Sequence, residues 1–172
     1  RSLVNDRLPF GTVSIFQNNS YFQIIALFYP MGNFKFIPHT ADIAVQITAK
    51  TMEDLFSMAA SALKSAVVED FKSKNNISYK LNCSAQILEE LLVIFLNEIN
   101  YLYFSKKFIF CQVAELSIKK PADQYMAEAV LMGENFSLKH HIFKEEIKAV
   151  TYHNLEIKNT DEGFSVTIVF DI

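Results

Sequence analysis

The chain has 172 residues, of which 51% are hydrophobic, 13% aromatic and 20% charged, and its formal net charge is −3 at pH 7. This length fits one domain better than two, and the apolar fraction is high enough for a hydrophobic core, which excludes an intrinsically disordered chain. The lack of repeats excludes a solenoid, and the slightly acidic balance excludes a strongly basic nucleic-acid-binding surface. We expect a single compact domain that binds RNA poorly on its own and could meet RNA only through a partner.

Residues 1–30 differ from the rest of the chain. They begin with arginine rather than methionine and contain two of the four prolines. Their most apolar part, residues 21–30, is about half as long as a membrane span, and no small-residue cleavage site of a signal peptide follows it. We interpret residues 1–30 as an upstream extension or fragment, with Met31 as the start of a domain over residues 31–172. The alternative is an extra strand at 21–28 that pairs with a sheet edge.

The first patterned segments predict a strand and then a helix. Residues 43–48 alternate between apolar and other side chains, as in a half-buried strand. Thr51 offers an N-cap hydroxyl, and the acids after it suit the positive end of a helix. Apolar residues then recur at helical spacing, so we expect the helix to reach Val67, with a strand at 75–81 after a polar loop.

A second helix is expected to follow, with Ser84 as its cap. Apolar residues from Ile87 to Leu102 form a stripe of about five turns, and acids and asparagines fall largely between them. A helix with so wide an apolar stripe is expected to lie at the centre of the core.

The remaining sequence predicts mainly strands. They are expected at residues 108–110, 113–118, 125–132, 142–152, 155–158 and 164–170, with a break at 133–135 and a hairpin loop at 159–163. Strands outnumber helices, and the two helices are well separated in the chain. We therefore predict an α+β fold in which two main helices pack on a largely antiparallel β-sheet.

Few residues are candidates for chemistry. The four glycines are scattered and form no phosphate-binding loop, and no nucleophile motif is present. Cys83 and Cys111 are far apart and belong to no CxxC or CxxH motif, so we expect buried, reduced thiols in a cytoplasmic protein. His140 and His141 are adjacent and would point to opposite faces of a strand, so we interpret them as solvated loop residues.

One set of polar groups suits a metal ion. His39 and Asp42 lie where the chain turns into a strand, and Asp171 lies on the opposite face from the apolar side chains of the last strand. The carboxylates of Asp42 and Asp171, together with the carboxyl group of Ile172, would suit a hard cation such as Ca²⁺ or Mg²⁺. This requires the last strand to lie beside the 39–42 turn, which spacing alone does not show. An aspartate before a strand is usually a turn residue.

Charged residues also alternate in sign along one later segment, at Lys144, Glu145, Glu146 and Lys148. One interpretation is a solvated sheet face with weak cross-strand ion pairs. The other is a polar surface shaped for a protein partner.

Five short motifs occur in order along the chain: His39-Thr-Ala-Asp-Ile43, Phe95-Leu-Asn-Glu-Ile99, Gly133-Glu134, Glu146-Ile-Lys-Ala-Val-Thr-Tyr-His153 and Ile168-Val-Phe-Asp-Ile172. Each is weak alone, but five in this order resemble the archease family over about residues 33–172. Two positions depart from the common pattern: Phe95 stands where Trp is frequent, and Ala44 where Gly is frequent. Phe95 keeps an aromatic anchor, and neither residue is a proposed ligand.

The resemblance implies a small α+β protein that is not an enzyme but a cofactor of the RtcB-type RNA ligase, which joins tRNA halves using GTP and a divalent metal. It implies that the chain promotes guanylylation and repeated turnover of that ligase, and that it can broaden the nucleotides accepted. It also implies a metal site formed by Asp42, Asp171 and the main-chain oxygen of Ile172. Ca²⁺ is the expected ion, with Mg²⁺, Mn²⁺ or Zn²⁺ as alternatives.

His39, Lys148 and His153 are further candidates for the polar surface around this metal site. Lys148 is expected either near a phosphate or nucleotide, or in an ion pair with a neighbouring glutamate. We expect no contact with a membrane.

Two alternative functions come from other classes. One is a metal-dependent hydrolase, with Asp42 and Asp171 as ligands and His39 or His153 as base. The other is a general chaperone or scaffold that binds exposed apolar surface, whose action would be insensitive to chelation and to changes at both aspartates.

Overall fold

The computed structural model describes residues 30–69 and 71–172. The interpretation of the first residues as an extension, and the alternative strand at 21–28, therefore lie outside the described residues. In the described part, no helix is both long enough and apolar enough to cross a membrane.

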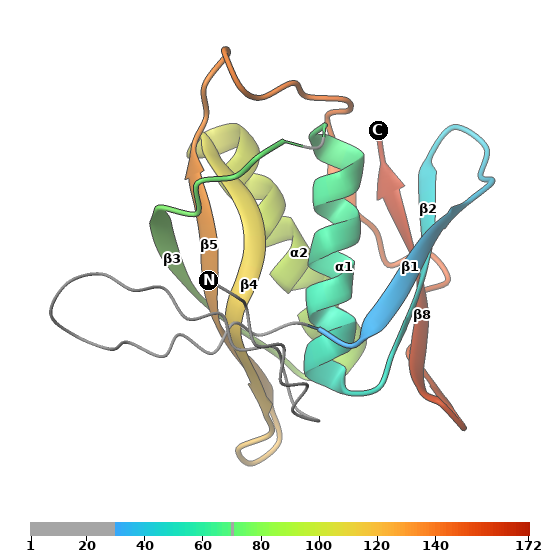
Figure 1. The fold of residues 1–172 in the computed structure, drawn as a ribbon. Helices are drawn as coiled ribbons and strands as arrows, with labels where there is room; N and C mark the ends of the chain where they lie inside the picture. Colours follow the sequence, from blue (N-terminus) through green and yellow to red (C-terminus); the bar gives the residue numbers. More distant parts are fainter. Residues whose placement is uncertain (1–29, 70) are drawn as a thin grey trace, which may run out of the picture.

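Two helices lie between two antiparallel sheets (Figure 1). The elements in chain order are β1 (Gly32–Ile37), β2 (Ile43–Ala49), α1 (Met52–Val67), β3 (Ile77–Ala85), α2 (Leu88–Ser105), β4 (Phe108–Lys119), β5 (Tyr125–Asn135), β6 (Ala149–Val150), β7 (Lys158–Thr160) and β8 (Gly163–Asp171). One sheet has the order β1-β2-β8-β6, with β7 also paired to β8, and the other has the order β3-β5-β4. The predicted α+β class with two main helices is confirmed, with the strands divided between two sheets.

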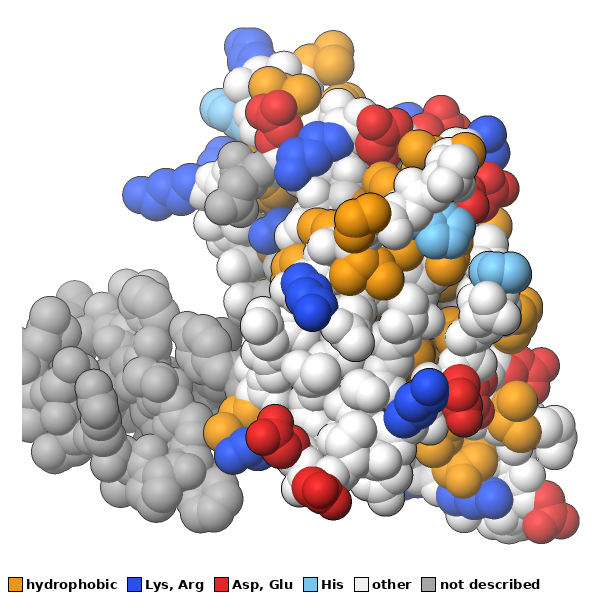
Figure 2. Space-filling view, turned by 90° about the vertical axis from the view of Figure 1, so that its right-hand side faces the viewer, with side chains coloured by type: hydrophobic (Ala, Val, Ile, Leu, Met, Phe, Trp, Pro, Cys, Tyr) orange, Lys and Arg blue, Asp and Glu red, His pale blue; other side chains and the backbone are white. Residues whose placement is uncertain are grey.

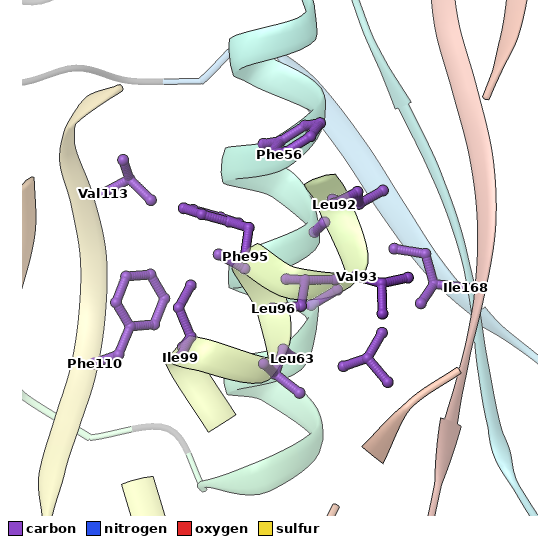
Figure 3. Close-up of a cluster of buried hydrophobic side chains, with 14 of the residues drawn as sticks. Phe56, Leu63, Leu92, Val93, Phe95, Leu96, Ile99, Phe110, Val113 and Ile168 are labelled. Carbon is purple, nitrogen blue, oxygen red and sulfur yellow. The ribbon is translucent and has the colours of Figure 1, made fainter. Parts of the chain in front are cut away.

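The core lies where α2 meets both sheets. Figure 3 shows Phe95 and Leu96 of α2 at the centre, with Phe110 of β4 on one side and Ile168 of β8 on the other. All four side chains are fully buried. A helix covered on two sides needs an apolar surface wider than one stripe, which explains its high apolar content. Each large side chain buried here contributes about 1.5–3 kcal/mol.

The two helices begin differently. Thr51 caps α1 as predicted, and its Oγ1 accepts a hydrogen bond from the Asp54 main-chain N–H at 3.1 Å. The predicted cap at Ser84 is wrong, because Ser84 pairs with Met126 inside the β3–β5 ladder. The N-cap of α2 is instead Ile87, whose side chain makes no capping hydrogen bond.

Sheet pairing overrides two predicted interruptions. The segments predicted at 108–110 and 113–118 are one strand, β4, with two register shifts against β5. The predicted break at 133–135 is wrong, since β5 continues to Asn135. A Cβ atom on Gly133 would lie 2.2 Å from the Ile109 carbonyl oxygen, so glycine allows the two strands to approach here rather than ending one.

The predicted strand at 142–152 is mostly wrong, because only Ala149–Val150 pairs with β8. Before Lys148 the main chain of this segment bonds to helices: the Lys144 N–H donates to the Val67 carbonyl at 2.9 Å, and the Ile147 carbonyl accepts from the Asn100 side chain at 2.7 Å. Of the strand predicted at 155–158, only Lys158 belongs to a strand, β7.

Candidate functional site

The last strand lies beside the 39–42 turn, as the metal hypothesis required. Strands β2 and β8 are antiparallel, and their final partners are Ile43 and Phe170. Asp42 and Asp171 are the next residues along the two strands, so the ladder brings them to the same end of the sheet. We call this end the sheet tip and define it by five residues: His39, Asp42, Lys148, Asp171 and Ile172.

The sheet tip lies at the upper end of Figure 1, where the β1–β2 loop and the end of β8 are both found. Figure 2 views the side of the molecule on which β1, β2 and β8 lie. On this face the centre is largely uncharged, side chains of both charges lie toward its upper and lower ends, and histidines lie in its upper half. The face has no broad basic patch, in line with the charge balance of the sequence.

Lys148 reaches the sheet tip from the other side of β8. Ala149 of β6 pairs with Asp171, and the Lys148 main-chain N–H donates to the Asp171 carbonyl at 2.9 Å. The Lys148 Nζ atom donates to the main-chain oxygen of Ile172 at 2.7 Å. The lysine thus contacts one of the expected metal ligands, rather than a neighbouring glutamate.

Two asparagines of α2 hold the main chain on both sides of Lys148. The Asn97 side chain accepts from the Val150 N–H at 2.9 Å and donates to the Val150 carbonyl at 3.3 Å. Asn100, which is buried, donates to the Ile147 carbonyl at 2.7 Å. Asn97 of the Leu-Asn-Glu motif therefore contacts Val150 of the Lys-Ala-Val motif and holds its main chain in place.

His39 lies beside Asp42 on an exposed turn. The distance from His39 Nδ1 to Asp42 Oδ2 is 3.5 Å, and the two side chains are 32% and 31% exposed. Ala41 adopts φ 63°, the left-handed conformation that turns the chain toward β2. A groove of about 440 Å³ borders this turn, and Lys144 and the end of α1 also line it.

His153 is not brought to the sheet tip. The Thr151 N–H donates to the Val169 carbonyl at 3.1 Å, so the segment after β6 runs along β8 away from its end. His153 is exposed, and its Nε2 atom lies 3.0 Å from Asn154 Nδ2. The structure therefore brings Asp42, Asp171, Ile172 and Lys148 to one end of the sheet, with His39 beside Asp42, and leaves His153 apart.

The donors at the sheet tip are all oxygens. Across residues 30–69 and 71–172, no group of three or more His, Cys, Asp or Glu side chains is placed to hold a metal ion. The candidate set at the tip consists of two carboxylates and the Ile172 main-chain oxygen, and Asp42, Asp171 and Ile172 are all partly exposed. Oxygen donors of this kind fit Ca²⁺ or Mg²⁺ better than Zn²⁺, which favours nitrogen and sulfur in structural sites.

A second polar cluster was not predicted. His141 is buried, so its interpretation as a solvated residue is wrong, whereas His140 is exposed as expected. The His141 Nε2 atom lies 2.9 Å from Glu134 Oε1, and its Nδ1 accepts from the Ser137 N–H at 2.9 Å. Glu134 Oε2 accepts from the Lys74 N–H at 2.6 Å. In the sequence, the Gly133-Glu134 motif marks this carboxylate, but the motif alone does not identify His141 and Lys74 as the partners of Glu134.

The charge state of this cluster follows from its contacts. Burial alone would raise the pKa of Glu134, but the hydrogen bonds from Lys74 and His141 and the charge of His141 together lower it below its ordinary value. Every polar side-chain atom of Glu134 and His141 has a partner within the chain, and these contacts connect Glu134 to the segment at Lys74 and to the loop at 137–141. The cluster is therefore structural.

Both cysteines are free but only partly buried, which modifies the expectation of fully buried thiols. Burial, followed by the charge of Glu98, raises the pKa of Cys83 to about 11. Burial also raises the pKa of Cys111, although a hydrogen bond from Ser73 partly opposes the shift. Both are thiols rather than thiolates at neutral pH, and so are poor nucleophiles.

Together, the fold and the sheet tip define a small two-sheet α+β protein with oxygen donors gathered where the ladder between β2 and β8 ends. The Archease protein family (MTH1598/TM1083) matches residues 34–172. The chain belongs to the archease family.

Individual relatives agree with this assignment. Protein archease of Methanosarcina barkeri is 34% identical over 139 residues, which are 81% of this chain and 95% of that protein. Protein archease of Pyrococcus furiosus is 30% identical over 133 residues, 77% of this chain and 93% of its own length. The solution structure of Methanobacterium thermoautotrophicum protein 1598 is 22% identical with a TM-score of 0.63, covers 81% of this chain and 98% of that one, and shows the shared fold.

Proposed function

We propose that this chain is a non-catalytic cofactor of an RtcB-type RNA ligase in the cytoplasm, where it promotes guanylylation and repeated turnover of the ligase. It would meet RNA only through that partner. Membership of the archease family supports the cofactor role. The observation that supports a role for the sheet tip is the β2–β8 register, which ends at Ile43 and Phe170 and so brings the next residues, Asp42 and Asp171, to the same end of the sheet.

In this proposal, Asp42, Asp171 and the Ile172 main-chain oxygen hold a divalent cation, with Ca²⁺ as the expected ion and Mg²⁺ as the alternative that the oxygen donors also suit. A bound divalent cation would balance the two carboxylate charges and, with only three donors from the chain, would keep coordination positions for an anionic group of the partner. His39 restricts the Asp42 side chain through its contact at 3.5 Å. Asn97 and Asn100 fix the main chain that brings Lys148 to the same end of the sheet.

The test is guanylylation of the cognate ligase with GTP, measured with and without this protein. Wild type should stimulate the reaction, and Asp42→Asn and Asp171→Asn should reduce it to nearly the level of the ligase alone. Asp161→Asn is the matched control, because Asp161 is an exposed acid in the turn at the other end of β8. It should stimulate like wild type.

Two outcomes would contradict the proposal. Failure of wild type to stimulate a competent ligase would remove the cofactor role and make metal-dependent hydrolysis the next assay. Stimulation that survives both aspartate changes and chelation would indicate a scaffold that acts without the sheet tip.

A further inference from the structure

We infer that Lys148 is an internal cation of the sheet tip that competes with a divalent metal for the Ile172 oxygen, so that metal binding frees the lysine. This inference rests on the proposed metal role of the sheet tip. It adds a regulation of that site by the protein's own side chain.

The contact that supports it joins Lys148 Nζ to the Ile172 main-chain oxygen at 2.7 Å. This is a short, charge-assisted hydrogen bond to one of the three proposed donors. In the structure, therefore, an ammonium group already occupies the oxygen that a metal ion would need.

The two cations compete mainly through charge. A carbonyl oxygen has two lone pairs, so geometry alone would let it accept both the ammonium and the metal. A divalent ion and an ammonium about 5 Å apart, however, repel each other even at the dielectric constant of water, by an amount equivalent to roughly tenfold in affinity. The free energy is lower when the lysine leaves.

The lysine can leave without disturbing the fold. Lys148 is exposed, so its ammonium group can return to water. Its main chain stays in place, because its N–H is bonded to the Asp171 carbonyl at 2.9 Å and Asn97 and Asn100 hold the flanking residues. The Lys148 side chain can therefore move while its main chain stays in place.

Lys144 provides a matched control on the same segment. It is also exposed, and its Nζ atom also donates to a main-chain oxygen, that of Ser65, at 2.9 Å. That oxygen is not one of the proposed metal donors. Removing either lysine changes the net charge equally, but only Lys148 competes for the metal.

The first experiment is calorimetric titration of the full chain with CaCl₂ at low ionic strength. Lys148→Met should bind Ca²⁺ about tenfold more tightly than wild type, and Lys148→Arg, which keeps the charge, should remain close to wild type. Lys144→Met should change the affinity less than Lys148→Met does, since its ammonium bonds to the Ser65 oxygen and not to a proposed metal donor. Added salt should narrow the difference between Lys148→Met and wild type.

The second experiment needs no variant. Brief acylation with an amine reagent, followed by mass spectrometry, should modify Lys148 faster when Ca²⁺ is added, while the modification of Lys144 stays constant. Calcium-independent acylation of Lys148 in a protein that binds calcium would overturn the inference.

The outcomes separate the two proposals. Equal or weaker binding by Lys148→Met, when wild type binds, would overturn the inference and leave the metal site intact. Binding by Lys148→Met alone would support the inference, since the lysine would then block the site. Lack of binding by both would overturn the inference together with the metal part of the proposed function.

Discussion

The molecule contains two histidine–carboxylate pairs that have the same chemistry and opposite surroundings. His141 and Glu134 are 2.9 Å apart, with side chains 0% and 9% exposed. His39 and Asp42 are 3.5 Å apart and about one-third exposed. In the buried pair, both carboxylate oxygens and both ring nitrogens have partners within the chain. In the exposed pair, the carboxylate keeps capacity for another ligand, so exposure distinguishes a structural pair from a candidate binding site.

The surroundings explain the difference. The His141 ring lies 4.6 Å from the Phe71 ring and 5.8 Å from the Phe136 ring, measured between centroids. Among apolar rings a polar group must be paired, because its lost hydration is not otherwise replaced. At the turn before β2, water solvates both side chains and weakens their attraction.

The largest expected effect tests the buried pair. His141→Ala should destabilise the fold by about 3 kcal/mol or more, because it leaves a buried carboxylate without its partner and opens a cavity. Urea unfolding at pH 7 measures the change. Asp42→Ala, assayed in the same metal-free buffer, should stay within about 0.5 kcal/mol of wild type. A large loss in Asp42→Ala would show that the exposed pair is structural as well.

The pH dependence of stability should come from the buried pair. Because the folded-state pKa of Glu134 lies below its ordinary value of 4.5, its carboxylate stabilises the fold above that pH. The contribution is lost as the pH falls through the folded-state pKa. Wild type should therefore be more stable than Glu134→Gln at pH 7, and the difference should shrink in acid. A difference that is constant from pH 7 to pH 3 would contradict the assigned charge.

The smallest effect is expected at the exposed pair. His39→Ala should change the free energy of unfolding by less than about 0.5 kcal/mol, as for other exposed ion pairs. Ligase stimulation should fall only partly, since His39 restricts Asp42 but is not a proposed ligand. Thermal unfolding and the guanylylation assay measure the two effects. Complete loss of stimulation in a folded His39→Ala variant would make the histidine a direct participant.

Local signals predicted the elements that depend on neighbouring residues. The Thr51 cap and the helical spacing of α1 depend on residues only a few positions apart in the sequence. The same is true of the alternation of apolar and polar side chains in β8. The strand β1 was not predicted, because it is a short edge strand whose Phe36 is 45% exposed and whose pattern is correspondingly weak. The strand predicted after Ile142 was mostly wrong, because side chains of α2, far away in the sequence, take up main-chain hydrogen bonds of this segment.

The sequence by itself named the residues of the sheet tip, Asp42, Asp171, Ile172, His39 and Lys148, from residue type and from the family resemblance, but it also named His153, which the structure leaves apart. The placement of the sheet-tip residues at one end of a sheet was decided by the register of β2 against β8 and of β6 against β8. The contact of Lys148 with the Ile172 oxygen and the burial of His141 were likewise decided by the tertiary structure. The physical reason is that pairing between strands far apart in the chain, and exclusion of water by packed layers, depend on the whole fold, whereas caps and periodicity depend only on neighbouring residues.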